Sequence, residues 1–185
     1  MMHLTRQLTA ISGLCLTLST PAIADLSGTQ TIQLLDKDNS AHTIGSITFT
    51  HEGEQTQYQL HIDHSQFTDY FLSMKEMKCL EGPELWCHLP YPYPSPRTIS
   101  PDNTQWLSHD LLFMFKKPNE FGANFWNGIY YEFTVTDEGL IGRARAVDLN
   151  ELAAPPDDLG IPPFAPMMLE DIDEGQRWLP SAVIR

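Results

Sequence analysis

The sequence predicts a mainly β protein, an antiparallel meander that closes into a small calycin-like barrel or packs as a sandwich, with one short helix and long proline-rich straps. Three observations predict this class. Apolar and polar residues alternate with period two in several segments, and no heptad pattern persists. Turn-forming clusters such as residues 51–54 and 136–139 separate the alternating segments. The chain has 14 prolines, most of which lie outside those segments.

The first half of the chain predicts a hairpin meander. Residues 31–34 and 47–49 alternate, and residues 57–63 show the clearest pattern, in which Tyr58, Leu60 and Ile62 share one face. The opposite face of that strand carries glutamine, histidine and aspartate. A sheet with one wet face follows.

Residues 65–77 change character. Phe67, Tyr70, Phe71 and Met74 recur at helical spacing, and Ser65 stands where an N-cap is expected. The spacing predicts one or two helical turns after the third strand.

Residues 89–96 carry prolines at alternate positions. An extended chain of this kind loses every N–H on one side, so it pairs along one edge at most. It is either a rigid strap that covers a sheet edge or a recognition strip that presents Tyr91 and Tyr93; the strap is the favoured interpretation.

The second half predicts more strands and then an irregular segment. Residues 111–115 form an apolar run typical of a strand buried on both faces, and residues 121–135 and 140–147 form a hairpin. Residues 153–185 are rich in proline and acidic residues, and residues 182–184 are apolar enough to add a last strand that packs back on the domain.

The N-terminus predicts export. Residues 8–18 are apolar but too short to span a bilayer, which takes about 20 residues, and residues 22–24 (Ala-Ile-Ala) give the small-x-small pattern of a cleavage site. We expect residues 1–24 to be a cleaved signal peptide and residues 25–185 to be one periplasmic domain with no membrane span.

The charge balance excludes some partners. Without residues 1–24 the chain keeps 10 basic and 24 acidic residues, a net charge of −14. Such a surface repels phosphate backbones and anionic lipid, so nucleic acid is not an expected partner. No sequence motif indicates a cofactor.

Two cysteines, Cys79 and Cys87, remain in the expected mature chain. An even number in an oxidising compartment predicts one disulfide, and seven intervening residues do not fit a CxxC redox pair. Gly82 and Pro83 lie between them and predict the turn that brings the two cysteines together.

Several residues are candidates for ligand binding. Aromatic residues of 121–135 either line a ligand cavity or fill the core, and two arginines on the next strand either pair with carboxylates or bind an anion. The ligand candidates are Trp126, Tyr131, Phe133, Arg143 and Arg145, with Tyr91 and Tyr93 of the strap.

Catalytic and metal sites are weaker alternatives. A hydrolase would use carboxylates or His109, which precedes Asp110, but no nucleophile motif accompanies them. A metal would bind through His61 and Asp63, which share a strand face, or through Met74, Met77 and His88. We assign no catalytic or metal residue from the sequence.

The segments CLEGPELWCHLPYPY, FGANFWNGIYYEF and VDLNELAAPP resemble periplasmic proteins of proteobacteria that have no assigned activity. The resemblance covers most of the expected mature chain and implies a periplasmic location. The hairpin FWNGIYYEFTVTDEGLIGRARAV is similar to lipocalin hairpins at the level of fold alone. The sequence therefore favours a non-enzymatic periplasmic domain that binds a small ligand or a protein partner.

Overall fold

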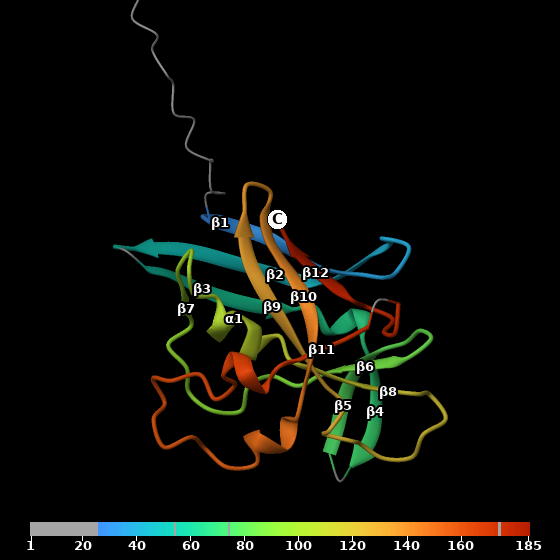
Figure 1. Ribbon diagram of the computed structural model, residues 1–185. Helices are drawn as coiled ribbons and strands as arrows, with labels where there is room; N and C mark the ends of the chain where they lie inside the picture. The colour runs from blue at the N-terminus through green and yellow to red at the C-terminus, as the bar shows by residue number, and fades with distance from the viewer. Residues whose placement is uncertain (1–25, 54, 74, 174) are drawn as a thin grey trace, which may run out of the picture.

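The computed structural model describes residues 26–185 except 54, 74 and 174 (Figure 1). The expected signal peptide, residues 1–24, lies outside the described residues. The described chain folds into strands joined by long loops, one α-helix and three 3-10 turns. The strands are β1 (Gly28–Leu35), β2 (Ala41–Glu52), β3 (Gln55–Ile62), β4 (Thr68–Ser73), β5 (Lys75–Leu80), β6 (Leu85–His88), β7 (Thr98–Ile99), β8 (Phe113–Lys116), β9 (Gly128–Thr136), β10 (Gly139–Val147), β11 (Glu170–Asp171) and β12 (Ser181–Ile184); the helix is α1 (Gln105–Asp110), and the 3-10 turns are η1 (His64–Gln66), η2 (Leu149–Leu152) and η3 (Pro166–Met168).

All the strand pairs are antiparallel and belong to one sheet, with the order β4-β5-β6-β8-β9-β10-β12-β1-β2-β3-β7 and with β11 beside β10. The predicted mainly β class and antiparallel pairing are confirmed. The predicted barrel is wrong, because a barrel requires its end strands to pair, and β4 and β7 remain separate edges. The sheet is an open, strongly curved one (Figure 1).

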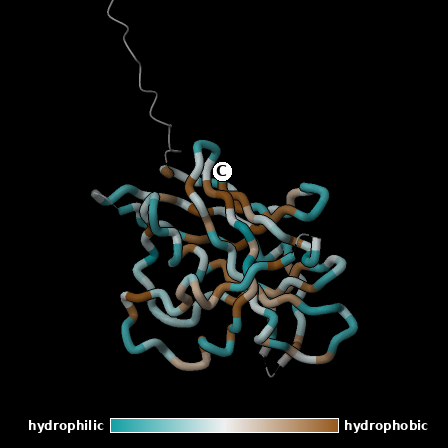
Figure 2. Tube along the Cα trace, viewed as in Figure 1, coloured by the Kyte–Doolittle hydropathy of each residue, from teal (hydrophilic) through white to brown (hydrophobic). Residues whose placement is uncertain are grey.

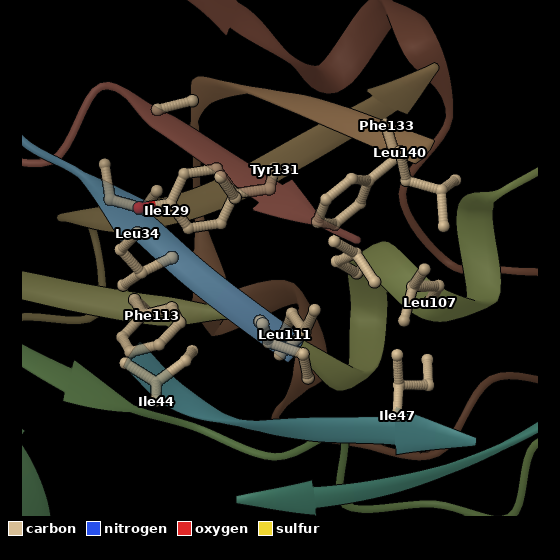
Figure 3. Packing of buried hydrophobic residues seen from close by; sticks show 14 of the residues in the cluster. Leu34, Ile44, Ile47, Leu107, Leu111, Phe113, Ile129, Tyr131, Phe133 and Leu140 are labelled. Carbon is tan, nitrogen blue, oxygen red and sulfur yellow. The ribbon is translucent and has the colours of Figure 1, made fainter. Parts of the chain in front are cut away.

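The space inside the curve is filled by apolar side chains. Leu107 of α1 and Leu111, directly after it, belong to one core cluster with Ile47, Phe133 and Leu140 from three different strands (Figure 3). Apolar residues concentrate along the inner parts of the strands and polar residues at the loop tips (Figure 2). Burial of this apolar surface is the main stabilising contribution to such a sheet.

The predicted hairpins match the structure. Glu52 and Gln55 are the last partners of the β2–β3 pair, the β9–β10 pair turns at residues 136–139, and the apolar run 111–115 supplies the buried strand β8. Residues 182–184 also form a strand, β12, as predicted. It inserts between β10 and β1 and thereby joins the two halves of the sheet.

The predicted helix at residues 65–77 is wrong. Asp63 caps the short turn η1 by accepting a hydrogen bond from the backbone N–H of Ser65, and the chain then enters the β4–β5 hairpin. Phe67 is buried while Phe71 is 79% exposed. Strand pairing overrode the helical spacing here. The α-helix of the described chain lies instead at residues 105–110, where its face toward the core carries Leu107.

The predicted disulfide between Cys79 and Cys87 is confirmed. The two residues are directly opposed in the β5–β6 pair, with their Cα atoms 3.8 Å apart. The turn between them packs closely, since a Cβ on Gly82 would lie 2.4 Å from the Trp178 ring. The disulfide and this contact therefore fix the same hairpin.

Among the helices of the described residues, none has the length and apolar character needed to cross a bilayer.

Candidate functional site

A cleft of about 700 Å³ opens between the end of β3 and the β5–β6 hairpin, where the two ends of the curved sheet approach without pairing. The strap that follows β6 and the end of α1 contribute the rest of its wall. The residues that line it are Leu60, His61, Ile62, His64, Glu76, Met77, Lys78, His88, Leu89, Pro90, Tyr91, Arg97, Asp110 and Phe125.

Asp110, the last residue of α1, places a buried carboxylate in the cleft. Its Oδ2 accepts a hydrogen bond of 2.9 Å from the Tyr58 hydroxyl and lies 3.6 Å from Arg97 Nε. Oδ1 makes no hydrogen bond to any described residue. Burial raises the pKa of Asp110, whereas the Tyr58 hydroxyl and the Arg97 charge lower it. The two partners on Oδ2 offset only part of the effect of burial, so the pKa of Asp110 stays above its ordinary value.

His88, at the end of β6, contributes a nitrogen acceptor. Its Nε2 lies 3.1 Å from the Asp110 carbonyl oxygen. Because a carbonyl only accepts, Nε2 carries the proton in the neutral ring, and Nδ1 is left as an acceptor without a described partner. Burial lowers the pKa of His88 and so favours this neutral form.

Tyr91 contributes a buried hydroxyl that has no hydrogen-bond partner among the described residues. Its ring is held edge-on against Tyr93, with centroids 5.7 Å apart, and against His109, with centroids 5.6 Å apart. Burial raises the pKa of Tyr91, and the nearby Asp110 carboxylate adds to the increase. A tyrosine in so tight a setting usually has a partner for its hydroxyl, so this group is the least satisfied one in the cleft wall.

Arg97 stands at the mouth of the cleft in a left-handed conformation, with φ of 51°. Its carbonyl accepts from the Tyr58 N–H, and the next two residues form β7 on the edge of β3. The left-handed residue therefore turns the strap away from β3, which leaves the end of β3 uncovered beside the cleft.

The rest of the rim is charged but balanced. Lys78 is paired with Asp69 and lies 3.5 Å from Glu76. His61 and His64 approach from the β3 side. Sequence reasoning singled out Tyr91 but missed Asp110 as an acceptor, His88 as an acceptor and Arg97. The strap was the sequence feature that could have pointed to Arg97, because a rigid proline-rich segment between two strands restricts the position of the residue that follows it.

His109, the histidine considered for a hydrolase, lies in the core. Its Nδ1 donates to the Gln105 carbonyl at 2.8 Å, and its Nε2 accepts from the Phe164 N–H at 3.2 Å. The ring stacks on Phe164 with centroids 5.2 Å apart. Burial lowers its pKa to about 4. Both nitrogens are engaged, so His109 has no free atom for proton transfer to a substrate.

The aromatic ligand candidates are not brought together. Tyr131 is fully buried and donates its hydroxyl hydrogen bond to the Leu179 carbonyl at 2.9 Å, and Phe133 is buried in the same core. Trp126 is 71% exposed. Tyr131 and Phe133 thus fill the core, and Trp126 lies apart from them on the surface.

The two strap tyrosines, Tyr91 and Tyr93, do not form the exposed recognition strip that the sequence offered as an alternative. Tyr91 is 7% exposed, and Tyr93 is partly buried with its hydroxyl donating to the Leu152 carbonyl at 2.8 Å. Tyr91 is the one ligand candidate from the sequence that lines the large cleft.

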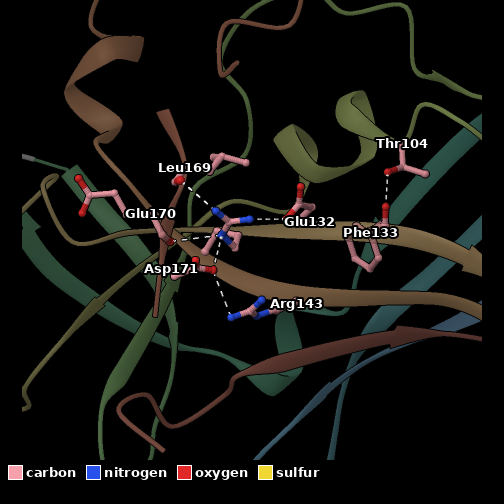
Figure 4. A network of polar contacts seen from close by, with 8 residues as sticks. Thr104, Glu132, Phe133, Arg143, Leu169, Glu170 and Asp171 are labelled. Carbon is pink, nitrogen blue, oxygen red and sulfur yellow. Dashed lines mark hydrogen bonds and ion pairs between the residues drawn. The ribbon is translucent and has the colours of Figure 1, made fainter. Parts of the chain in front are cut away.

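Arg143 and Arg145 bind the C-terminal segment. Arg145 donates to Glu132 at 2.6 Å and to the Leu169 carbonyl at 3.0 Å, and Arg143 lies 3.2 Å from Asp171 (Figure 4). These contacts hold β11 against β10. The arginines therefore pair with carboxylates and carbonyls of the protein, which is one of the two interpretations that the sequence offered.

His61 and Asp63, the first pair considered for a metal, have no third ligand grouped with them among the described residues. In the part of the chain that the structure describes, no three His, Cys, Asp or Glu residues are grouped as metal ligands would be. Asp63 Oδ1 is used by the N–H and hydroxyl of Ser65. Met77 and His88 both line the cleft, and Met74 lies outside the described residues.

No family model, curated protein or solved structure matches this chain. The geometry of the cleft is therefore the basis for any functional argument.

Proposed function

We propose that the protein binds a small molecule in the cleft between β3 and the β5–β6 hairpin, and that it does so as a non-enzymatic domain of the periplasm. The unpartnered Tyr91 hydroxyl in the cleft wall is the observation that carries this proposal. A buried polar group without a partner destabilises a fold by about 1–3 kcal/mol, and such groups gather where a ligand or an ordered water completes the hydrogen bonding.

The composition of the cleft supports the same proposal. Its volume of about 700 Å³ suits a small molecule, and its wall combines apolar side chains with a few polar atoms, as ligand sites do. The unused Asp110 Oδ1 and His88 Nδ1 add two more atoms able to bind a ligand. The disulfide supports an oxidising compartment.

A fragment titration tests the proposal. Methyl-labelled protein is titrated with a soluble set of alcohols, amines, carboxylates and amides, and the shifts of the Ile62 and Met77 methyl groups are followed by NMR. We expect at least one chemical class to shift both methyl groups with saturation.

A matched pair of variants provides the control. Ile62→Trp places a large ring in the cleft and should abolish the Met77 shifts. Ile141→Trp makes the same change on the surface of β10, where Ile141 is 43% exposed, and should leave them intact. Shifts that map elsewhere, or that persist in Ile62→Trp, would overturn the proposal.

A further inference from the structure

Three residues of the cleft wall, Asp110, His88 and Tyr91, each have an atom that can accept a further hydrogen bond. Asp110 Oδ1 and His88 Nδ1 only accept hydrogen bonds, and the Tyr91 hydroxyl can accept one as well as donate. Asp110 and His88 are held together, because His88 binds the backbone carbonyl of Asp110. A ligand that donates hydrogen bonds would therefore satisfy these atoms.

The buried carboxylate of Asp110 favours a cation. The Asp110 side chain is 8% exposed, while its cationic neighbour Arg97 is 61% exposed and approaches Oδ2 at 3.6 Å. A cation so exposed is hydrated and screened, and it compensates a buried carboxylate only in part. At the rim Lys78 already has two acidic partners. A carboxylate or phosphate ligand would meet the unpaired Asp110 oxygen and be repelled.

The walls of the cleft favour an apolar tail. Leu60 and Ile62 come from β3, and Met77 comes from β5 on the opposite side of the cleft. The apolar lining is completed by Leu89, Pro90 and Phe125. A chain of methylene groups in contact with such a wall gains about 0.8 kcal/mol for each group buried.

We propose that the cleft binds a primary ammonium ion that carries an apolar substituent. An –NH₃⁺ group supplies N–H donors and a positive charge, which suit the Asp110 carboxylate and the His88 Nδ1 acceptor in the same cleft. This inference rests on the proposed function of the same cleft and names the chemistry of its ligand. The overall acidity of the protein raises the local concentration of such a cation.

Probes with one tail and different head groups test the inference. Hexylamine, 1-hexanol and hexanoate are titrated into the purified protein, with the Ile62 and Met77 methyl groups as the NMR readout. We expect hexylamine to bind at least tenfold more tightly than 1-hexanol, and hexanoate not to saturate. Hexyltrimethylammonium keeps the charge but has no N–H donor, and it should bind at least tenfold more weakly than hexylamine.

Protein variants link the preference to Asp110. Asp110→Asn retains the size of the side chain and removes its charge, so hexylamine should fall to the affinity of 1-hexanol. Asp102→Asn, at an exposed turn outside the cleft, should bind hexylamine as the unaltered protein does. The comparison of hexylamine with its trimethyl analogue needs no variant and stands even where Asp110→Asn does not fold.

The outcomes separate this inference from the proposed function. If the fragment set shifts the cleft methyl groups but hexylamine binds no better than 1-hexanol, or binds Asp110→Asn unchanged, the ammonium inference is overturned and the binding cleft stands. If no fragment and no hexyl probe shifts those groups, both fall.

Discussion

Removal of the Tyr91 hydroxyl should affect ligand affinity without lowering the stability of the protein. Because it is buried without a partner, removing it should not destabilise the protein. Tyr91→Phe keeps the ring contacts with Tyr93 and His109. We expect the free energy of unfolding in denaturant to stay equal or to rise by about 1 kcal/mol, while ligand affinity falls. Tyr131→Phe is the control, since its hydroxyl is bonded to Leu179, and its loss should destabilise the protein by about 1 kcal/mol. A marked loss of stability in Tyr91→Phe would show that its hydroxyl has a partner.

His109 gives the protein an acid-sensitive core. Its pKa is about 4 in the folded protein, below the ordinary value of 6.5, because burial disfavours the charged ring. The unfolded chain therefore takes up a proton as the pH falls through about 6.5, while the folded protein does not until about pH 4. The stability from the neutral ring is complete above pH 6.5 and declines between pH 6.5 and 4, by on the order of 3 kcal/mol.

Denaturant unfolding at a series of pH values checks this linkage. His109→Gln cannot be charged, so its stability should depend less on pH across that window, although it is lower at pH 7. The buried His88 contributes in the same direction and keeps some slope in the variant. An identical slope in both proteins would contradict the role given to His109.

At the scale of elements, the left-handed residue Arg97 sets where β7 begins and where the cleft opens. A left-handed conformation costs a residue with a Cβ about 1–2 kcal/mol relative to glycine. Arg97→Gly and Arg97→Ala both remove the guanidinium beside Asp110, but only glycine relieves the backbone. We expect the glycine variant to be more stable than the alanine variant by about 1 kcal/mol in thermal or chemical unfolding. Equal stabilities would show that the backbone at this position carries no strain.

The β5–β6 hairpin depends on its disulfide. The bridge closes a short loop, for which the chain-entropy model gives about 2–3 kcal/mol. Reduction, or replacement of both Cys79 and Cys87 by serine, should lower the free energy of unfolding by that amount. Because the hairpin forms one wall of the cleft, ligand binding should weaken together with stability. A reduced protein that is as stable as the oxidised one would contradict this.

The limits of sequence reasoning also lie at this scale. The alternation of β2, β3 and β10 is local, so it could be predicted from residues a few positions apart. The conformation of residues 65–77 could not, because Phe67, Tyr70 and Phe71 also fit a helix and only the pairing of β4 with β5 decides between them. The cleft could not be predicted either. Asp110, His88 and Tyr58 meet through packing of α1 between strands that are far apart in the sequence.

For the whole molecule, β12 is the connection between two halves of the sheet. It pairs with β10 on one side and with β1 on the other, and β10 and β1 have no other link within the sheet. Removal of residues 181–185 should expose both strand edges and abolish a single cooperative unfolding transition, as followed by calorimetry. Arg185→Ala, which keeps the backbone bonds to Thr31, is the control and should unfold as the unaltered protein does. A cooperative truncated protein would contradict the role given to β12.

The place of β12 also bears on the order of events when the chain is made. Ile32 of β1 pairs with Ile184 of β12. The first described strand therefore pairs with the strand that is synthesised last among those described. Before β12 is made, β1 has no partner on the edge that faces β10. The half of the sheet that contains β1, β2 and β3 is then not joined to the half that contains β10. The sheet as a whole can therefore form only after the last of these strands has been made.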